Sequence, residues 1–281
     1  MTSDQHPLFV TELAIYPIKS TRRVPVQQAR VVTTGFAHDR RWMLVDPEGK
    51  FITQRQHPKM VHIVAQPDDQ GIIVDAPGMN EIHIAQPFLE GVLEQVLQQE
   101  SRHRFEVTVW KDQCGALDAG DQAAQWFSEY MGFNCRLVFM DDGCQRPVDQ
   151  RYGLTSDLTS FSDGFPFLLT SETSLADLNG RLDQPVPMDR FRANIVINGL
   201  EAFAEDNWQR IRIGSVEFRV SKACTRCIMT TVDTQTGIKG KEPLQTLASY
   251  RRGEKGVLFG MNLNHDSEGV ISVGDSVEIL D

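Results

Sequence analysis

The strongest constraint on the fold of this sequence is a series of short segments, within its first 110 residues, in which apolar and polar residues alternate. Turn-forming residues separate the segments, for example at positions 46–49 and 77–78. The segments are 8–18, 29–35, 41–46, 60–65, 71–75, 81–85 and 104–110. Short strands at this spacing are typical of a β-sandwich or β-barrel. The first part of the chain is therefore predicted to be barrel-like.

Two segments have a helical period in this part of the chain. Residues 88–100 fit a helix as well as a strand, so their structure stays open. Residues 118–133 have acidic residues near their start and Gly132 near their end, as helices often do. Their larger apolar residues recur at helical spacing: Ala123, Trp126, Phe127 and Tyr130. We predict a helix there, followed by a strand at 136–140.

A long segment, 144–164, has little periodicity and many turn-forming residues. Loops of this length in a compact domain are often functional. Beyond it, strands are predicted at 166–170, 193–199, 215–223 and 271–280, and helices at 171–182 and 244–252. Ser171 is placed to cap the first of these helices.

The fold class predicted from these patterns is mainly β with some α (α+β), in two β-barrel-like lobes. The boundary is soft, around 112–118 or later in the long loop, and we place the domains at 1–117 and 118–281. With 281 residues and 41% hydrophobic content, the chain is long enough to bury such cores.

Composition limits the partners and the compartment. The formal charge of −10 argues against nucleic acid or an anionic membrane as the main partner. The first residues lack the pattern of a secretory signal, and no apolar run is long enough to span a bilayer. A cytoplasmic protein with mostly reduced thiols is the expectation.

Two of the five cysteines, Cys224 and Cys227, lie two residues apart with Arg226 between them. The pair is compatible with half a zinc site, a redox disulfide, a ligand for another metal, or two buried thiols. The remaining cysteines are isolated in sequence, and the pair follows a predicted strand, which disfavours zinc and thioredoxin-like chemistry. From spacing alone, two buried thiols are the simplest interpretation. Arg226 opposes it, because a neighbouring guanidinium favours the metal-binding thiolate.

Cationic residues lie at the ends of several predicted strands, namely Lys19, Arg40, Arg41 and Arg192, and the stretch "QRQHPK" adds Arg55. Each alone is best explained as a solvated or structural charge. Together they permit a cationic pocket for a phosphate or another anion, because guanidinium groups hold such ligands well.

Five stretches, in order along nearly the whole chain, carry a resemblance. They are "LAIYPIKS", "DRRWMLVDPEGKFITQRQHPKM", "SDGFPFLLTSETSLADLN", "FRANIVINGLEAFAEDNW" and "KACTRCIMTTVDTQTG". The chain thereby resembles the MOSC family, in the branch with an N-terminal β-barrel domain. That branch includes the mitochondrial amidoxime-reducing component and bacterial YcbX-type proteins.

The resemblance implies a molybdenum cofactor, a molybdopterin whose metal also takes one protein cysteine. Carried onto this sequence, the metal ligand is Cys227. Asp163 lies where a carboxylate could reach the substrate or the pterin, and the alternative is a carboxylate that caps the loop. The implied cofactor-binding residues are Lys19, Ser20, Arg40, Gly164, Phe165, Arg192, Asn194, Thr225 and Arg226. At Gly164 and Phe165 the contact is expected through the backbone.

The activity implied by the resemblance is reduction of small N-hydroxylated compounds such as hydroxylamines, amidoximes and N-hydroxylated bases, a form of detoxification. The alternative is a carrier of the cofactor or of sulfur without turnover. Many YcbX-type proteins also carry a ferredoxin-like Cys-x4-Cys-x2-Cys run, which this sequence lacks, so no iron–sulfur cluster is expected. Electrons are then expected from a separate ferredoxin- or cytochrome-like protein.

Overall fold

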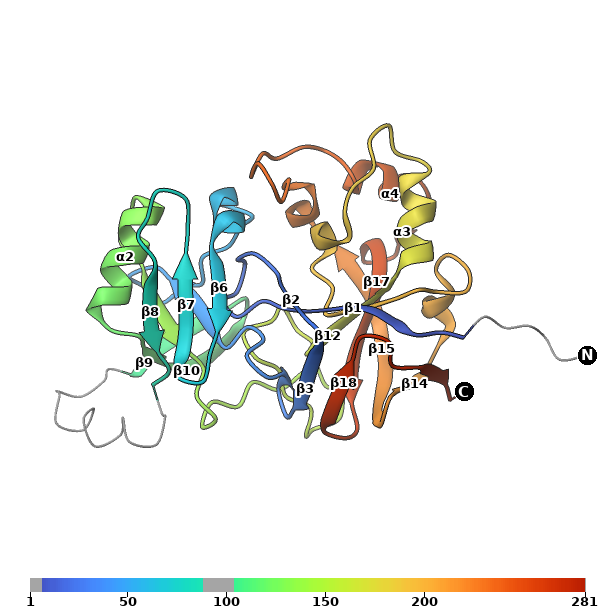
Figure 1. Cartoon of the computed structure of the whole chain (residues 1–281), viewed down its shortest axis with the longest axis horizontal. Helices are drawn as coiled ribbons and strands as arrows, with labels where there is room; N and C mark the ends of the chain where they lie inside the picture. The colour runs from blue at the N-terminus through green and yellow to red at the C-terminus, as the bar shows by residue number, and fades with distance from the viewer. Residues whose placement is uncertain (1–6, 88–103, 281) are drawn as a thin grey trace, which may run out of the picture.

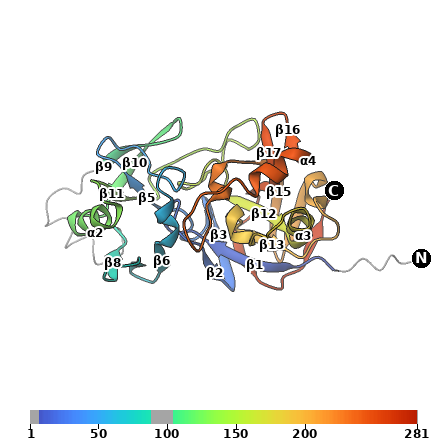
Figure 2. The same ribbon diagram turned by 90° about the horizontal axis from the view of Figure 1, so that it is seen from above.

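A computed structural model describes residues 7–87 and 104–280 of the chain. Two lobes lie side by side along the long axis of the molecule, as Figure 1 and Figure 2 show. Strands dominate both lobes, and three α-helices occur among the described residues, so the α+β class predicted from the sequence is confirmed. No helix in the described ranges combines the length and apolarity needed to cross a bilayer.

The first lobe is built from two small antiparallel sheets and one helix. Its elements are β5 (Trp42–Val45), η1 (Pro58–His62), β6 (Val64–Pro67), β7 (Gly71–Asp75), β8 (Ile82–Ala85), β9 (Arg104–Val109), β10 (Asp112–Asp118), α2 (Asp121–Met131) and β11 (Arg136–Phe139). One sheet has the order β5-β11-β10-β9 and the other β6-β7-β8. Helix α2 presents Trp126 and Phe127 to a core that also contains Leu44 and Ile72.

The second lobe is built around a nine-stranded sheet. The strands of the whole lobe are β1 (Val10–Ile15), β2 (Val24–Val26), β3 (Gln28–Val32), β4 (Gly35–Phe36), β12 (Phe167–Ser171), β13 (Ile195–Ile197), β14 (Arg210–Ile213), β15 (Val216–Arg226), β16 (Arg252–Gly253), β17 (Gly256–His265), β18 (Gly269–Ser272) and β19 (Val277–Ile279). Its helices are α3 (Glu172–Asn179), η2 (Met188–Phe191), η3 (Ala204–Asn207), η4 (Ile228–Thr231) and α4 (Leu244–Tyr250).

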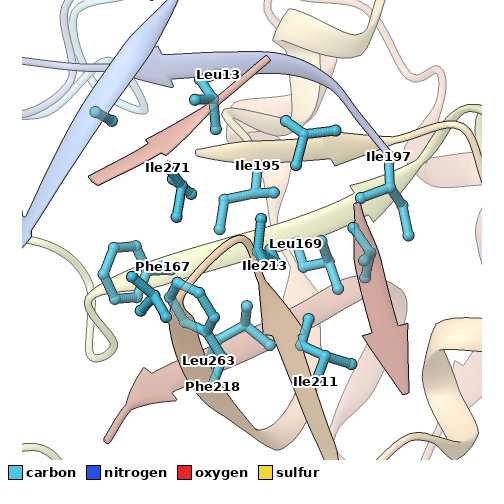
Figure 3. Packing of buried hydrophobic residues seen from close by; sticks show 14 of the residues in the cluster. Leu13, Phe167, Leu169, Ile195, Ile197, Ile211, Ile213, Phe218, Leu263 and Ile271 are labelled. Carbon is cyan, nitrogen blue, oxygen red and sulfur yellow. The ribbon is translucent and has the colours of Figure 1, made fainter. Parts of the chain in front are cut away.

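The large sheet has the order β19-β14-β15-β17-β12-β13-β1-β2, and its ninth strand, β16, pairs with β17. Strands β18, β3 and β4 form a separate small sheet. Strands from both ends of the chain therefore meet in this lobe. Figure 3 shows its core, where Leu13 from β1, Phe167 and Leu169 from β12, Ile195 from β13 and Ile271 from β18 point toward one another. Burying side chains of this size stabilises the fold by about 1.5–3 kcal/mol each.

Strand pairing crosses position 117, which is the boundary between the two domains that was predicted from the sequence. Strand β1 pairs with β13 and β3 pairs with β18, so the first 36 residues contribute to the second lobe. Conversely, β11 pairs with β5 and β10, and α2 packs in the core of the first lobe. The long loop at 144–164 then connects the lobes.

Most predicted elements are confirmed. Helix α2 ends at Met131 and is followed by Gly132, whose φ of +74° is the left-handed conformation that favours glycine. Ser171 caps α3 by accepting a hydrogen bond from the Ser174 N–H at 3.2 Å, a contact that contributes about 1 kcal/mol. The ambiguous segment 88–100 lies outside the described residues.

Two strand predictions were wrong in part. Residues 58–62 form the 3-10 helix η1, since Pro58 fits the first turn of a helix and interrupts strand pairing, and β6 begins only at Val64. Residues 271–280 form two strands rather than one. Gly274, at φ +93°, turns the chain between β18 and β19, which belong to different sheets.

Candidate functional site

A pocket of about 410 Å³ collects residues from both lobes and from the long loop. That volume is within the range of small-molecule and cofactor sites. All the residues assigned from the sequence to the metal, the cofactor or the substrate line it: Lys19, Ser20, Arg40, Asp163, Gly164, Phe165, Arg192, Asn194, Thr225, Arg226 and Cys227. Of the other cations singled out, Arg55 also lines the pocket, whereas Arg41 does not. The cationic pocket that the strand-end residues permitted is therefore present, although the role of each residue stays a prediction.

Cys227 follows directly after β15, which runs three residues further than predicted and carries Thr225 and Arg226 to the pocket. The Cys227 carbonyl accepts hydrogen bonds from the Thr230 N–H at 3.1 Å and the Thr230 hydroxyl at 3.0 Å, at the start of η4. These bonds fix the backbone of the cysteine. Its Sγ accepts a hydrogen bond from Arg55 Nε at 3.2 Å.

Cys224 has different surroundings, and both thiols are free. Its Sγ accepts from Arg226 Nη1 at 3.0 Å, and its side chain packs against the apolar cluster around Phe191 and Phe259. The described residues contain no group of three or more His, Cys, Asp or Glu side chains that could hold a metal ion. A four-ligand zinc site therefore has no donor set there, whereas a metal that needs one protein thiol does.

Asp163 organises one wall of the pocket. Its carboxylate accepts from Lys19 Nζ at 2.6 Å, from Arg55 Nη2 at 2.7 Å and from Trp110 Nε1 at 3.2 Å. Desolvation alone would raise the pKa of Asp163, but the two cations outweigh it and hold that pKa well below its usual range. The carboxylate is ionised at neutral pH and orients three neighbours.

Lys19 is buried, with 3% of its surface exposed. Burial lowers its pKa to about 8, against the opposing effect of Asp163. Its Nζ also donates to the Phe161 carbonyl at 2.6 Å, so the ammonium bridges two positions of the long loop.

The long loop is held in place by Arg146, which is 3% exposed. Its Nη1 donates to the carbonyls of Ser160 at 2.8 Å and Ser162 at 2.6 Å, and its Nε donates to Asp112 on β10 at 3.0 Å. These contacts fix the backbone immediately before Asp163. Arg146 was not singled out from the sequence.

Two guanidinium groups flank the buried ring of Tyr16: Arg192 lies 4.1 Å and Arg40 4.4 Å from its centroid. Burial and the neighbouring Arg40 lower the pKa of Arg192 to about 10, although Tyr16 opposes the shift. Arg40 Nη1 donates to Asp39 and, at 2.9 Å, to Asn194 Oδ1. Asn194 Nδ2 donates to the Ala14 carbonyl at 3.1 Å, so this side chain mainly positions Arg40.

Several polar groups at the pocket have no partner within the described part of the chain. They are the Ser20 N–H and hydroxyl, the N–H groups of Gly164 and Phe165, Arg55 Nη1 and Arg226 Nε. A Cβ at Gly164 would meet nothing within 4 Å, so the backbone there faces open space. Unpaired donors beside cations fit an anionic ligand such as a phosphate.

Backbone strain is concentrated at this pocket. Six non-glycine residues in the described ranges have positive φ, and four of them line it: Ser20 at +69°, Arg40 at +50°, Trp110 at +59° and Arg192 at +57°. Strained backbone of this kind clusters at functional sites, where the surrounding fold has to compensate for its cost.

Two family models match this chain, one in each half of the sequence. Residues 8–134 match the model of the MOSC N-terminal beta barrel domain, and residues 157–278 match that of the MOSC domain. Mitochondrial amidoxime-reducing component 1 of Xenopus laevis is 35% identical over 287 residues, which cover 95% of this chain and 81% of that protein. The same component of Mus musculus is 37% identical over 289 residues, covering 96% and 82%.

A third relative, mitochondrial amidoxime reducing component 2 of Bos taurus, is 36% identical over 285 residues, which cover 95% of this chain and 82% of that protein. The two domain models together account for most of the sequence, including every residue that was singled out around the pocket. The chain therefore belongs to the MOSC family, in the branch that carries the N-terminal β-barrel domain.

Proposed function

We propose that this chain is a molybdenum-cofactor-dependent reductase of N-hydroxylated compounds: hydroxylamines, amidoximes and N-hydroxylated bases. The observation that carries the proposal is the Cys227 thiol in a cationic pocket with unpaired N–H donors. A single soft sulfur ligand suits a molybdenum–sulfur centre, and the cations suit its phosphate. The relatives named amidoxime-reducing components support the class of reaction.

The residues divide the work between them. When bound, the cofactor supplies the two-electron chemistry that converts an N–OH compound, with two protons, into the N–H compound and water. Cys227 would hold the metal, and Arg55 fixes that sulfur by its hydrogen bond from Nε. Lys19, Arg40 and Arg192 would neutralise the phosphate.

The remaining predicted residues orient the bound molecules. The unpaired N–H groups of Ser20, Gly164 and Phe165 would bind the cofactor through the backbone. Thr225 and Arg226 flank the thiol on the pocket wall. Because Asp163 is held ionised, it serves as a fixed carboxylate rather than as a proton donor at neutral pH.

The proposal also includes a separate electron-transfer protein, ferredoxin- or cytochrome-like, and a cytoplasmic location. The test combines two measurements. Elemental analysis and pterin fluorescence report the cofactor content of the purified protein, and an assay with a reduced electron donor reports whether the protein reduces an amidoxime. We expect stoichiometric molybdenum and formation of the amidine. Loaded protein that reduces no hydroxylamine or amidoxime, yet transfers its cofactor to an apo-enzyme, would instead identify a carrier.

Arg55→Lys is expected to lower kcat/KM for an amidoxime by about 10–100-fold, with a smaller loss of metal. Lysine keeps the charge, but its donors lie on a single nitrogen, so it cannot reproduce the separate Nε contact with Cys227 and Nη2 contact with Asp163 that the planar guanidinium makes. Metal content, the EPR signal of the metal and kcat/KM are the measurements. Arg41→Lys is the matched control, because Arg41 donates to the Met140 carbonyl and Asp142 and does not line the pocket. An unchanged EPR signal and rate in Arg55→Lys would refute the positioning role.

Anion binding is expected to weaken as the pH rises through about 8, because Lys19 then loses its proton. In the unfolded chain the same lysine keeps its proton to about pH 10.4. Between about pH 8 and pH 10.4 the unfolded state therefore binds more protons than the folded state. In that range the contribution of Lys19 to the free energy of unfolding increases as the pH rises.

The measurement is calorimetric binding of inorganic phosphate to cofactor-free protein, in the wild type and in Lys19→Met. Phosphate ionisation affects both proteins equally, so the ratio of their affinities isolates Lys19. We expect the wild-type advantage to disappear above about pH 8. A ratio that stays constant across that pH would contradict the assignment.

A further inference from the structure

Trp110 occupies a backbone position that disfavours its own residue type. It is the first residue of the two-residue turn between β9 and β10, since Val109 pairs directly with Asp112. Its φ of +59° lies in the left-handed region. Glycine and asparagine are favoured there in tight hairpins, and bulky residues are rare. Turn formation therefore does not account for a tryptophan at this position. The reason then lies in the contacts of its side chain.

The indole is aimed at the pocket and held there by three neighbours. Its Nε1 donates to Asp163 Oδ1 at 3.2 Å. The guanidinium carbon of Arg55 lies 4.6 Å from the centroid of the indole ring, and the Phe51 ring lies 5.1 Å away at an angle of 56°. These contacts connect the turn to Asp163 and, through Arg55, to Cys227.

Despite these contacts, 47% of Trp110 is exposed. The other aromatic residues of the lining are less exposed: Phe165 is half-buried, Phe167 is 1% and Phe191 0% exposed. Much of the remaining lining consists of charged and polar groups suited to an anion. Among the described residues, Trp110 is the most exposed large apolar side chain of the lining.

We infer that the exposed indole of Trp110 is a stacking platform, which makes the pocket prefer planar, π-conjugated N-hydroxylated compounds over saturated ones with the same reacting group. This inference rests on the proposed function. Any planar ring has a π face that can stack on an aromatic side chain. Because Asp163, Arg55 and Phe51 already fix the indole, little conformational entropy is lost when a ligand stacks on it.

The kinetic test compares benzamidoxime with cyclohexanecarboxamidoxime, which share the reacting group and differ in planarity. Wild-type protein, Trp110→Phe and Trp110→Leu are assayed as cofactor-loaded protein with a reduced electron donor. Both variants lose the N–H bond to Asp163, so the comparison between them isolates the aromatic face. The readout is the ratio of the two kcat/KM values.

We expect the wild type and Trp110→Phe to favour the aromatic compound by about tenfold, and Trp110→Leu to lose the preference. A wild-type ratio near one would overturn the inference. So would a Trp110→Leu ratio equal to that of the wild type. Equal loss in both variants would also overturn it, because the N–H contact rather than the ring would then set the preference.

Fluorescence gives a second readout that needs no turnover. The other tryptophans, Trp42, Trp126 and Trp208, are at most 9% exposed, so a bound ligand reports mainly through Trp110. Without electron donor, benzamidoxime is expected to change the emission, its cyclohexyl counterpart is not, and Trp110→Phe abolishes the change. Binding seen this way without turnover under reducing conditions would refute the reductase and support the platform. Equal turnover of both compounds would do the reverse.

Discussion

Replacing Cys227 by serine is expected to remove molybdenum from the protein and to lower turnover of an amidoxime by at least about 100-fold. A hydroxyl is a hard donor and a poor substitute for the soft thiolate that a molybdenum–sulfur centre accepts. The Arg55 Nε donor would also lose the sulfur that lies 3.2 Å from it. Metal per protein and kcat/KM, measured on protein made in a cofactor-competent host, check the prediction.

Cys224→Ser is the matched control and is expected to keep the metal. The Cys224 sulfur accepts from Arg226 and packs toward the apolar cluster around Phe191, so it is a poor candidate for the same ligand. Loss of metal in Cys224→Ser with retention in Cys227→Ser would reverse the assignment. Retention in both variants would remove the thiol from the proposal.

Local patterns predicted most elements because strands and helices have fixed periods. The helical spacing of Trp126 and Phe127 is sufficient to place α2, since it depends only on neighbours along the chain. Pairing between distant strands has no such local signal. The sequence therefore did not reveal that β1 pairs with β13, or that the turn at Gly274 sends β18 and β19 to different sheets.

The site likewise has features that local sequence predicts and features that depend on distant contacts. Its motifs could be recognised one at a time along the sequence, but their convergence on one pocket depends on tertiary packing. From the sequence, Arg55 was only one of several scattered cations, because its contact with Cys227 spans 172 positions. Trp110 was visible only as the end of a predicted strand. What draws attention to Trp110 in the structure is its positive φ, which cannot be predicted from composition or periodicity.

Replacing Arg146 by methionine is expected to lower the free energy of unfolding by about 3 kcal/mol. The buried guanidinium satisfies the carbonyls of Ser160 and Ser162 and pairs with Asp112, and a thioether does none of these. A buried polar group that loses its hydrogen-bond partner lowers the free energy of unfolding by more than the hydrogen bond had contributed to it. Chemical denaturation of wild type and variant measures the difference.

The same variant is expected to lower kcat/KM, because release of the Ser162 carbonyl frees the backbone that positions Asp163. Arg151→Met tests whether any arginine of the loop would have this effect. Arg151 has 71% of its side chain exposed and pairs with Asp149 in solvent, so its loss should change stability and kcat/KM little. If both variants lose stability to the same extent, Arg146 is not the anchor of the loop. If Arg146→Met loses stability but keeps full kcat/KM, the position of Asp163 does not depend on that anchor.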